Sequence, residues 1–496
     1  MSIDPTRVPV IVGAAQINDR PTDPLAGLDS FGLMAAAAHR ADADAGGGWL
    51  NRLDSVAVVD QLSFPELGDL STRLTAELGA TPRLCYKSRY PSGASPIRML
   101  NEAALRIAAG EIEAALVAGG EALRTAAQRK SVRGEPGDDA MRAASVRRRP
   151  EAAIDYGLIT PTDIYPLYEN ATRVAWGQSL AEAQRESAEI WSRMSEVAAR
   201  NESAWLRKPV SPEEILTISA DNRPIAFPYS KLMVANSSVN QGAAFIVTSL
   251  AAARRRGVTE DRLAYVGYGA AADEPGGVMA RDRYSRSTSM IVSLTRALEL
   301  NSVKTADLDL IELYSCFPCI PKMARRVLDA PLDRAFTVFG GLTFGGGPIG
   351  NYMSHAVASM LEALRSGARR GLLFANGGFA NQNHTIILTR DPAGAASRPR
   401  SFDFHADADA AREPIPSLAE DYAGGAQIET YTVLYRRDGS VRMGVIVART
   451  PDGKRVLAHV PPDDTETLSF LTDGGAEPVG SSGEVLREGA HALWRR

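Results

Sequence analysis

Short apolar runs alternate with amphipathic stretches along the first part of the chain. Apolar runs at 8–11, 55–59 and 114–118 have the length and composition of strands that are buried on both faces of a sheet. Residues 95–109 instead carry apolar side chains at helical spacing, and Gly110 ends that pattern. We therefore expect helices and strands to alternate, as in an α/β sheet covered on both faces.

The same rhythm returns in the second half of the chain. A strand followed by a helix is predicted over 240–253, and a further strand over 262–267. The remaining predicted elements are helices at 288–300 and 351–366, strands at 308–313, 371–375 and 385–389, and a glycine-rich loop at 340–350. Two similar βα blocks in tandem indicate an internal duplication.

Residues from about 124 to 235 interrupt this alternation. They comprise a polar, arginine-rich stretch that includes Arg147 to Arg149, and then a long amphipathic helix around 181–201. We interpret them as a loop insertion outside the core. The insertion belongs to the first half of the duplicated unit, 1–255, and the second half spans 256–392.

A separate unit is predicted at the C-terminal end. Near Asp391 the composition changes to Ala, Gly, Pro and Asp, which indicates a linker over 393–425. From 427 onward, runs of alternating apolar and polar residues are separated by Asp-Gly turn signals. Short strands of this kind, without helices, predict a small antiparallel, OB-like β-barrel over 426–496.

Composition and charge disfavour several classes of partner. The formal net charge is −4, so the chain lacks the strongly basic character that nucleic acid or an anionic membrane surface requires. No apolar run approaches the roughly 18 residues of a membrane span, and the N-terminal residues do not have a signal-peptide pattern. We expect a cytoplasmic protein with neither nucleic-acid nor membrane partners.

The chain has three cysteines, which argues against a disulfide-stapled fold. Cys316 and Cys319 form a C-F-P-C pair, without a second ligand pair or the context of a redox motif. We interpret them as a packed or incidental pair rather than a redox or metal site. No metal and no resident cofactor are expected.

Five blocks of the sequence, taken together, resemble one family. The longest, 88–123, contains a Ser-Gly turn, the predicted helix, and a strand that ends in Gly-Gly-Glu. The other four are NQGAA at 240–244, IELYSCF at 311–317, GGLTFGGGP at 340–348 and FANGGF at 374–379. In this order and spacing, over roughly 5–390, they resemble the thiolases.

Within the thiolases the sequence is most similar to the sterol-carrier-protein-2 branch, because of the blocks at 311–317 and 340–348. Thiolase-like proteins of type 1, which carry a small C-terminal barrel and are often called acetyl-CoA acetyltransferases, fit the whole chain best. The resemblance implies a duplicated α/β thiolase fold of five layers, αβαβα, with an inserted loop domain and a C-terminal barrel.

The resemblance also locates the catalytic positions of a thiolase. A thiolase uses a cysteine thiolate whose pKa is lowered at a helix N-terminus, and that position here is Tyr90. The Asn or His that helps to bind the thioester oxygen falls at Tyr314, the second His at Gly347, and the second Cys at Ala375 or Asn376. Without these side chains, thiolysis is not expected.

Other parts of the thiolase site are main chain or match the family. The resemblance implies an oxyanion hole formed by the main-chain amides of Tyr90 and of Gly377 or Gly378. Ser237 resembles the family serine that contacts the pantetheine arm of CoA. Binding of CoA or an acyl-CoA is therefore implied to persist.

Three groups of residues are open to two interpretations each. His355 either replaces the lost imidazole or is a core or capping histidine. Arg147 to Arg149 either meet the phosphates of CoA or form a solvated loop. Tyr90 and Tyr314 either fill the vacated pocket or act as acid and base.

Two hypotheses on function follow. In the first, the protein is a non-catalytic or regulatory protein that binds acyl-CoA. In the second, it is an acyltransferase or a retro-aldol lyase that acts on the CoA ester of a fatty-acid or sterol side chain. Some thiolase-like proteins without the cysteine resemble this chain and act as retro-aldolases together with a β-barrel partner. Whether the chain is a monomer or a homodimer stays open.

Overall fold

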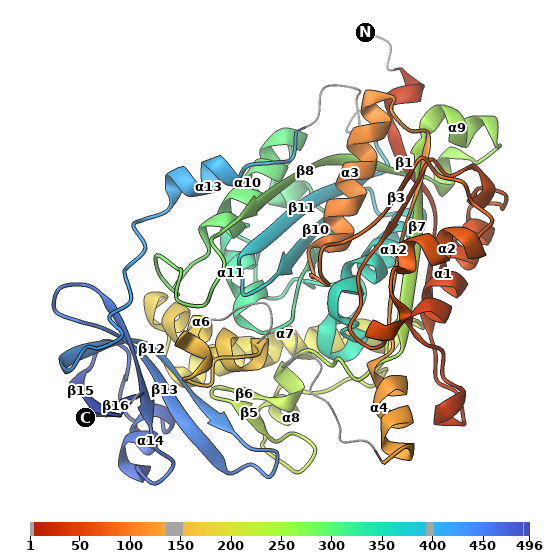
Figure 1. Ribbon diagram of the computed structural model, residues 1–496. Coiled ribbons are helices and arrows are strands. Elements are labelled where there is room, and N and C mark those ends of the chain that lie inside the picture. Colours follow the sequence, from red (N-terminus) through yellow and green to blue (C-terminus); the bar gives the residue numbers. More distant parts are fainter. Residues whose placement is uncertain (1–3, 135–151, 393–400, 490) are drawn as a thin grey trace.

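The computed structural model describes residues 4–134, 152–392, 401–489 and 491–496. A nine-stranded sheet forms the body of the protein, with the strand order β3-β2-β4-β7-β1-β8-β11-β10-β9 (Figure 1). The strands of its first half are β1 (Pro9–Asn18), β2 (Ser55–Val58), β3 (Leu84–Lys87), β4 (Ala114–Glu121) and β7 (Gln241–Ser249). Those of its second half are β8 (Ala264–Asp273), β9 (Leu310–Leu313), β10 (Arg370–Gly377) and β11 (Gln382–Thr389).

The two halves of the sheet share one topology. In the first half, β7 pairs antiparallel with β1 and β4, and β2 runs parallel to β4. In the second half, β11 pairs antiparallel with β8 and β10, and β9 runs parallel to β10. The halves meet where β1 pairs with β8 at Val10 and Tyr265. The predicted internal duplication is therefore confirmed, and β3, which the sequence pattern did not predict, extends the first half at its edge.

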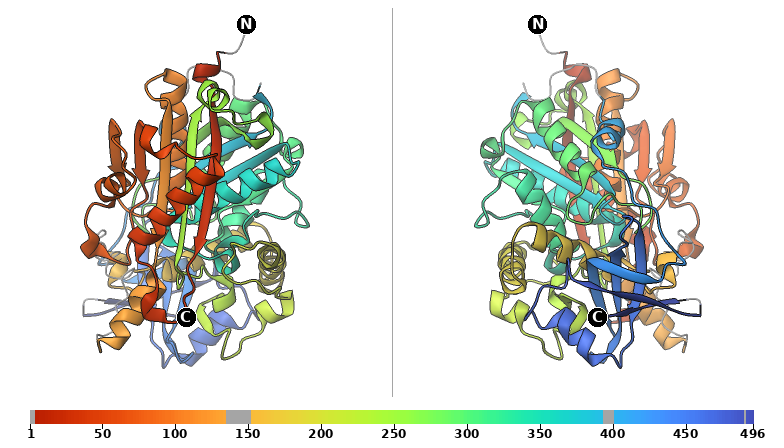
Figure 2. Two further views of the ribbon diagram at one scale, coloured as in Figure 1. Left: turned by 90° about the vertical axis from the view of Figure 1, so that its right-hand side faces the viewer. Right: turned by 90° about the vertical axis from the view of Figure 1, so that its left-hand side faces the viewer.

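Helices separate the two halves and cover their outer faces. α3 (Ser95–Ala109) and α12 (Tyr352–Arg365) lie between the half-sheets and contact strands of both. α1 (Ser30–Asp44) covers the outer face of the first half, and α10 (Thr288–Asn301) covers that of the second (Figure 2). The predicted five-layered αβαβα arrangement is thus confirmed.

The helix that precedes the candidate site follows its sequence pattern closely. α3 spans the predicted residues, and Ile97, Leu100 and Ala104 on its apolar face are fully buried. Gly110 ends the helix with φ of 70°, a left-handed conformation that glycine adopts without strain. Local periodicity was sufficient here because both half-sheets supply an apolar surface for the helix.

The prediction that the insertion lies outside the core is wrong for its two long helices. α6 (Pro161–Ala175) and α7 (Leu180–Arg200) bury large side chains such as Tyr168 and Trp191 in the main hydrophobic core. The amphipathic pattern of α7 was recognised, but not the surface that covers its apolar face. Neither α7 nor any other helix in the described part of the chain is long and apolar enough to cross a membrane. Arg147 to Arg149 lie outside the described residues.

A buried ion pair ties the insertion to the second half of the fold. Lys322 on α11 (Cys319–Val327) and Glu169 on α6 form a salt bridge, and neither is more than 2% exposed. Lys322 Nζ also donates to the Ala183 carbonyl at 3.1 Å and to Ser187 Oγ at 3.3 Å. Tyr229 donates to the second oxygen of Glu169 at 2.9 Å. Each charged group therefore keeps several partners inside the core.

The C-terminal domain is a closed five-stranded barrel, with strand order β13-β14-β16-β15-β12 and a pairing of β12 with β13 that closes it. Its strands are β12 (Gly424–Tyr435), β13 (Val441–Arg449), β14 (Arg455–Val460), β15 (Ser482–Glu488) and β16 (His491–Arg495). The predicted barrel is confirmed, and Figure 1 shows it below the nine-stranded sheet.

Three details of the C-terminal domain differ from the prediction. A helix, α14 (Thr465–Thr472), interrupts the strands, and β14 runs parallel to β16 rather than antiparallel. Two short strands of the insertion, β5 (Pro224–Ala226) and β6 (Tyr229–Ser230), extend the barrel sheet at β12. The closure of the barrel and the addition of β5 and β6 depend on contacts between residues that are distant in the sequence. The alternation of apolar and polar residues along a strand does not reveal such contacts.

We predict that Lys322→Met lowers the free energy of unfolding by about 3–5 kcal/mol, because Glu169 would keep a buried charge without its cation. The double variant Lys322→Met, Glu169→Gln should recover much of this loss. Urea unfolding followed by circular dichroism measures both effects. As a control, Arg254→Gln removes an exposed pair with Glu260 and should change the free energy by less than about 1 kcal/mol. A loss of similar size in both single variants would contradict the buried-pair argument.

Candidate functional site

A cavity of about 740 Å³ lies where the two halves of the fold meet the insertion. Its lining comes from segments that are far apart in the sequence, and each of the five blocks, or its flank, contributes to it together with residues 161–165 of the insertion and 276–277. Its lining includes Tyr90, Ser237, Tyr314, Gly347, Asn376, Gly377 and Gly378. The structure therefore brings the candidate site residues together, and of the two alternatives for the last position only Asn376, not Ala375, lines the cavity.

Tyr90 lies in the loop between β3 and α3, a few residues before the N-terminus of that helix. Its hydroxyl accepts a hydrogen bond from Gln382 Nε2. Ser92 Oγ in turn donates to Gln382 Oε1 at 2.7 Å. Gln382, at the start of β11, thus holds both side chains of the loop and is a site residue that the sequence analysis missed.

Tyr314 follows β9 and packs over Gly93. A Cβ atom at Gly93 would lie 2.3 Å from Tyr314 Oη and 2.2 Å from the Asn376 carbonyl oxygen, so glycine is required for this approach. Burial, and then the neighbouring Cys316, raise the pKa of Tyr314 well above its ordinary value. The phenol therefore remains protonated at neutral pH.

Asn376, at the end of β10, is fully buried and belongs to a network of polar side chains. Its Oδ1 accepts from the Tyr165 hydroxyl at 3.0 Å, and its Nδ2 donates to Asn383 Oδ1 at 2.8 Å. Tyr165 comes from α6 of the insertion, and burial raises its pKa well above the ordinary value. It is a second lining residue that the sequence analysis missed, because no local pattern connects α6 with β10.

The remaining predicted positions lie on the walls of the cavity. Gly347 N donates to the Asn236 carbonyl at 2.8 Å, which joins the glycine-rich loop to the segment that carries Ser237. Gly377 packs against Ser92, whose Oγ would lie 2.0 Å from a Cβ at that position. The geometry places Tyr90 and the glycine turn on one cavity. Their role as an oxyanion hole, and that of Ser237 toward CoA, stay predictions.

Cys316 lines the cavity, although the sequence analysis gave the cysteine pair no role. Burial raises the pKa of its thiol to about 12, so it is almost entirely protonated at neutral pH. Cys319 is also a free, buried cysteine and does not line the cavity. The interpretation as a packed pair therefore agrees with the burial of both thiols, and Cys316 adds a sulfur atom to the cavity wall.

His355 does not replace an imidazole in the cavity. It is fully buried on α12, stacks on Phe339 with ring centroids 5.0 Å apart, and contacts Gln16 Oε1 through Nδ1 at 2.9 Å. Burial lowers its pKa to about 3, so it is neutral. The core interpretation of His355 is confirmed, and no histidine lies among the residues described as lining the cavity.

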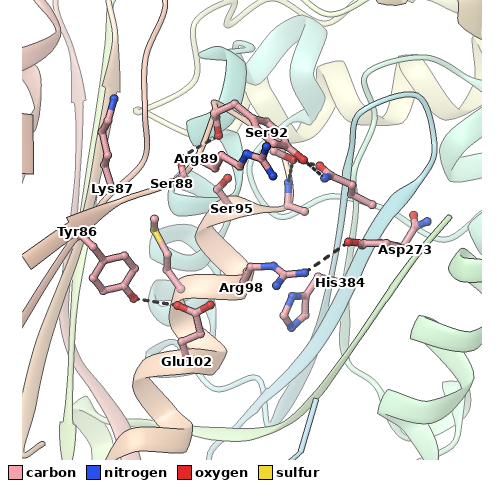
Figure 3. Close-up of a pocket in the computed structure, with 15 residues that line it drawn as sticks. Tyr86, Lys87, Ser88, Arg89, Ser92, Ser95, Arg98, Glu102, Asp273 and His384 are labelled. Carbon is pink, nitrogen blue, oxygen red and sulfur yellow. Dashed lines mark hydrogen bonds and ion pairs between the residues drawn. The ribbon is translucent and has the colours of Figure 1, made fainter. Parts of the chain in front are cut away.

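A second, smaller cavity of about 360 Å³ adjoins the first (Figure 3). The two share Arg89, Tyr90, Ser92 and Gln382 in their linings. The rest of its lining comes mainly from β3, α3 and β11, with Asp273 at the end of β8, and includes Arg98 and His384. The hydrogen-bonded side chains of Tyr90 and Gln382 therefore lie between the two spaces.

Comparisons with known proteins agree with this architecture. Residues 407–490 match the family model described as the thiolase-like protein type 1 additional C-terminal domain. No curated protein matches the chain. The structure is similar to that of a monomeric SCP2-thiolase like protein type 1 from Mycobacterium smegmatis, with 29% identity and a TM-score of 0.83. That match covers 99% of this chain and 100% of the other.

Two more distant solved structures share the fold. Human mitochondrial 3-ketoacyl-CoA thiolase in complex with CoA is 16% identical, with a TM-score of 0.60 over 78% of this chain and 99% of that one. The Ltp2-ChsH2(DUF35) aldolase is also 16% identical, with a TM-score of 0.59 over 79% of this chain and 98% of that one. The chain thus combines the thiolase fold with the additional C-terminal domain of the type 1 thiolase-like branch.

Proposed function

We propose that the protein binds CoA thioesters in the larger cavity and does not act as a thiolase. The observation that carries this proposal is the convergence of Tyr90, Tyr314, Gly347 and Asn376 on that one cavity. These are the positions where the thiolase resemblance expects the nucleophile, the oxygen-binding groups and the second cysteine. The relative from Mycobacterium smegmatis is monomeric, which supports a monomer here as well.

Thiolysis requires a nucleophile that is ionised near neutral pH, and burial opposes ionisation of the phenol of Tyr314 and the thiol of Cys316 in the cavity wall. Tyr314 and Cys316 are both held in their protonated forms by burial. With a pKa of about 12, roughly one Cys316 thiol in 10⁵ is ionised at pH 7. An acyl-enzyme intermediate on this sulfur is therefore strongly disfavoured.

The size and lining of the cavity suit a thioester. Its volume of about 740 Å³ lies within the range of roughly 300–1,000 Å³ that is usual for small-molecule sites. Apolar side chains such as Leu342, Ile349 and Phe379 line it together with the polar groups described above. An acyl chain and the end of a pantetheine arm would each find a matching surface there.

A second candidate function is a retro-aldol reaction on a CoA ester of a fatty-acid or sterol side chain. The Tyr314 hydroxyl favours it, since it lies in the cavity as a neutral phenol with no hydrogen bond to the described residues. In such a step a base removes the proton of the β-hydroxyl, the bond between the α and β carbons breaks, and its electron pair forms the thioester enolate. In this proposal Tyr314 protonates the α carbon or donates to the thioester oxygen. An acyltransferase of altered mechanism remains the further alternative.

We predict that saturating acyl-CoA stabilises the protein. At a ligand concentration of 100 times Kd, the free energy of unfolding should rise by about 2.7 kcal/mol, which a thermal-shift assay with butyryl-CoA and octanoyl-CoA detects. Ser237→Phe should abolish the shift by filling the cavity. The neighbouring Ser238 is exposed and does not line the cavity, so Ser238→Phe is the matched control. The absence of any shift in the parent protein would overturn the proposed function.

If the protein catalyses the retro-aldol reaction, Tyr314→Phe and Tyr90→Phe should each lower turnover of a β-hydroxyacyl-CoA by at least about 100-fold, the usual contribution of a general acid or base. Their affinity for acyl-CoA should stay within about threefold of the parent value. Release of the aldehyde or ketone is measured by mass spectrometry, with Tyr422→Phe in the C-terminal domain as the control. Unchanged turnover in both active-site variants would reject tyrosine acid-base chemistry.

We also predict that iodoacetamide modifies Cys85 at pH 8 well before Cys316. Cys85 is exposed, whereas the raised pKa of Cys316 leaves about one thiol in 10⁴ ionised at that pH. Peptide mass spectrometry after a time course separates the two sites. Because the fraction of ionised Cys316 thiol rises with pH until its raised pKa is reached, labelling of Cys316 should increase steadily up to pH 10. Rapid labelling of Cys316 at pH 7 would show that it is an activated nucleophile.

A further inference from the structure

The smaller cavity differs in character from the larger one, because charged and hydrogen-bonding side chains dominate its lining. Figure 3 shows these groups on β3, on the first turns of α3, at the end of β8 and on β11. The lining carries three cationic side chains, Lys87, Arg89 and Arg98, and two carboxylates, Glu102 and Asp273. Their pairing decides which charges are available to a ligand.

Both carboxylates already have partners in the protein. Glu102 accepts from the Tyr86 hydroxyl at 3.0 Å, and Asp273 lies 3.6 Å from Arg98 and 3.8 Å from His405. The ion pair of Arg98 with Asp273 is long and partly exposed, since the two side chains are 40% and 32% accessible. It therefore contributes little to stability and leaves most N–H donors of the guanidinium group unused.

Arg89 provides a cation that is not paired with a carboxylate of the described residues. Its side chain is exposed, lines both cavities, and forms no hydrogen bond or ion pair with the described residues. Lys87 lies farther out and pairs with Asp60 at 3.1 Å. Among the residues that the structure describes, Arg89 and Arg98 are therefore the guanidinium groups that a bound anion would meet.

His384 is an unpartnered polar group in the wall of the smaller cavity. Only 1% of the residue is exposed, and its Nε2 accepts from Asn101 Nδ2 at 2.9 Å. Because an amide nitrogen can only donate, the imidazole proton must be on Nδ1. That N–H has no hydrogen-bond partner in the described part of the chain. A buried donor in this state is costly unless a ligand acceptor satisfies it.

The N-terminus of α3 adds positive potential at the same place. The helix has 15 residues, its N-cap is Ala94, and no side chain caps it. Ala94, Ser95 and Arg98 of this first turn line the cavity. The helix dipole therefore acts in the same direction as the guanidinium groups.

We propose that the smaller cavity binds a carboxylate, and that this carboxylate is the far end of the acyl group of a CoA thioester held in the larger cavity. The inference rests on the proposed function and names its substrate class as ω-carboxyacyl-CoA. A planar carboxylate accepts paired donors from a guanidinium group, beside the wall that contains the unsatisfied Nδ1–H of His384. The acyl chain passes between the cavities at the side chains of Tyr90 and Gln382. The hydrogen bond between these two side chains would break, at a small net cost in free energy.

The experiment compares pairs of thioesters of equal chain length by isothermal titration calorimetry. The pairs are butyryl-CoA with succinyl-CoA, hexanoyl-CoA with adipoyl-CoA, and octanoyl-CoA with suberyl-CoA, and free adipate forms a separate arm. We expect at least one carboxyacyl-CoA to bind about tenfold or more tightly than its neutral partner, since a charge-assisted pair in a partly enclosed site contributes on this scale.

Arg98→Gln tests the site directly, because Arg98 lines only the smaller cavity. This variant should lose the preference for the carboxyacyl-CoA while its affinity for the neutral partner stays unchanged. Arg83→Gln is the matched control, since Arg83 is an exposed arginine near β3 that pairs with Asp54 and lines neither cavity. It should bind all ligands like the parent protein.

The outcomes separate this inference from the function on which it rests. Neutral acyl-CoA binding without preference for any carboxyacyl-CoA overturns the inference and leaves the proposed function intact. A preference that survives in Arg98→Gln also overturns it. Binding of free adipate that depends on Arg98, without a preference among the thioesters, shows that the carboxylate comes from a separate acid rather than from the acyl chain. If no CoA ester and no adipate bind, both proposals fail.

Discussion

The close approach of three chain segments at Gly93 determines the geometry of the site. A Cβ atom there would overlap both the Asn376 carbonyl and the Tyr314 hydroxyl, so the loop before α3 can pack on the ends of β9 and β10 only through glycine. The helix α3 belongs to the first half of the duplicated fold, whereas β9 and β10 belong to the second. This contact therefore joins the two halves at one cavity. Gln382 strengthens the junction, since it binds Tyr90 and Ser92 from the opposite strand.

The C-terminal barrel is part of this arrangement rather than an appendage. Arg455 of β14 is fully buried, pairs with Glu429, and donates to the carbonyl oxygens of Met279 and Asp282. The loop held in this way includes Gly276 and Gly277, which line the larger cavity. Arg281 of the same loop donates to the Phe379 carbonyl at 3.1 Å, next to the glycine turn. A buried guanidinium group with most of its donors used is a rigid link. The barrel therefore helps to set the position of two walls of the cavity.

The sequence predicted the elements and most of the site, and the reasons for its failures are physical. α3 was predicted to the residue because its periodicity and Gly110 are local signals. The thiolase resemblance placed Tyr90, Tyr314, Gly347 and Asn376, which the fold brings to one cavity. Tyr165, Cys316 and Gln382 were missed because their importance arises from tertiary contacts between distant segments. The burial of α6 and α7 was missed for the same reason, since an amphipathic pattern does not identify the surface that will cover it.

Burial constrains what chemistry the larger cavity can support. Tyr165 and Tyr314 have pKa values well above that of an exposed phenol, and the pKa of Cys316 rises to about 12, because the surrounding core disfavours each charged form. These three groups are therefore neutral donors rather than anionic nucleophiles. Neutral donors stabilise negative charge that develops on an oxygen atom of a ligand, and they do so more effectively in a protein interior than in water. An environment of this kind favours reactions that pass through an enolate over those that begin with attack by a thiolate. If the cavity is catalytic, the replacement of a thiolate by a phenol changes the type of reaction rather than only lowering its rate.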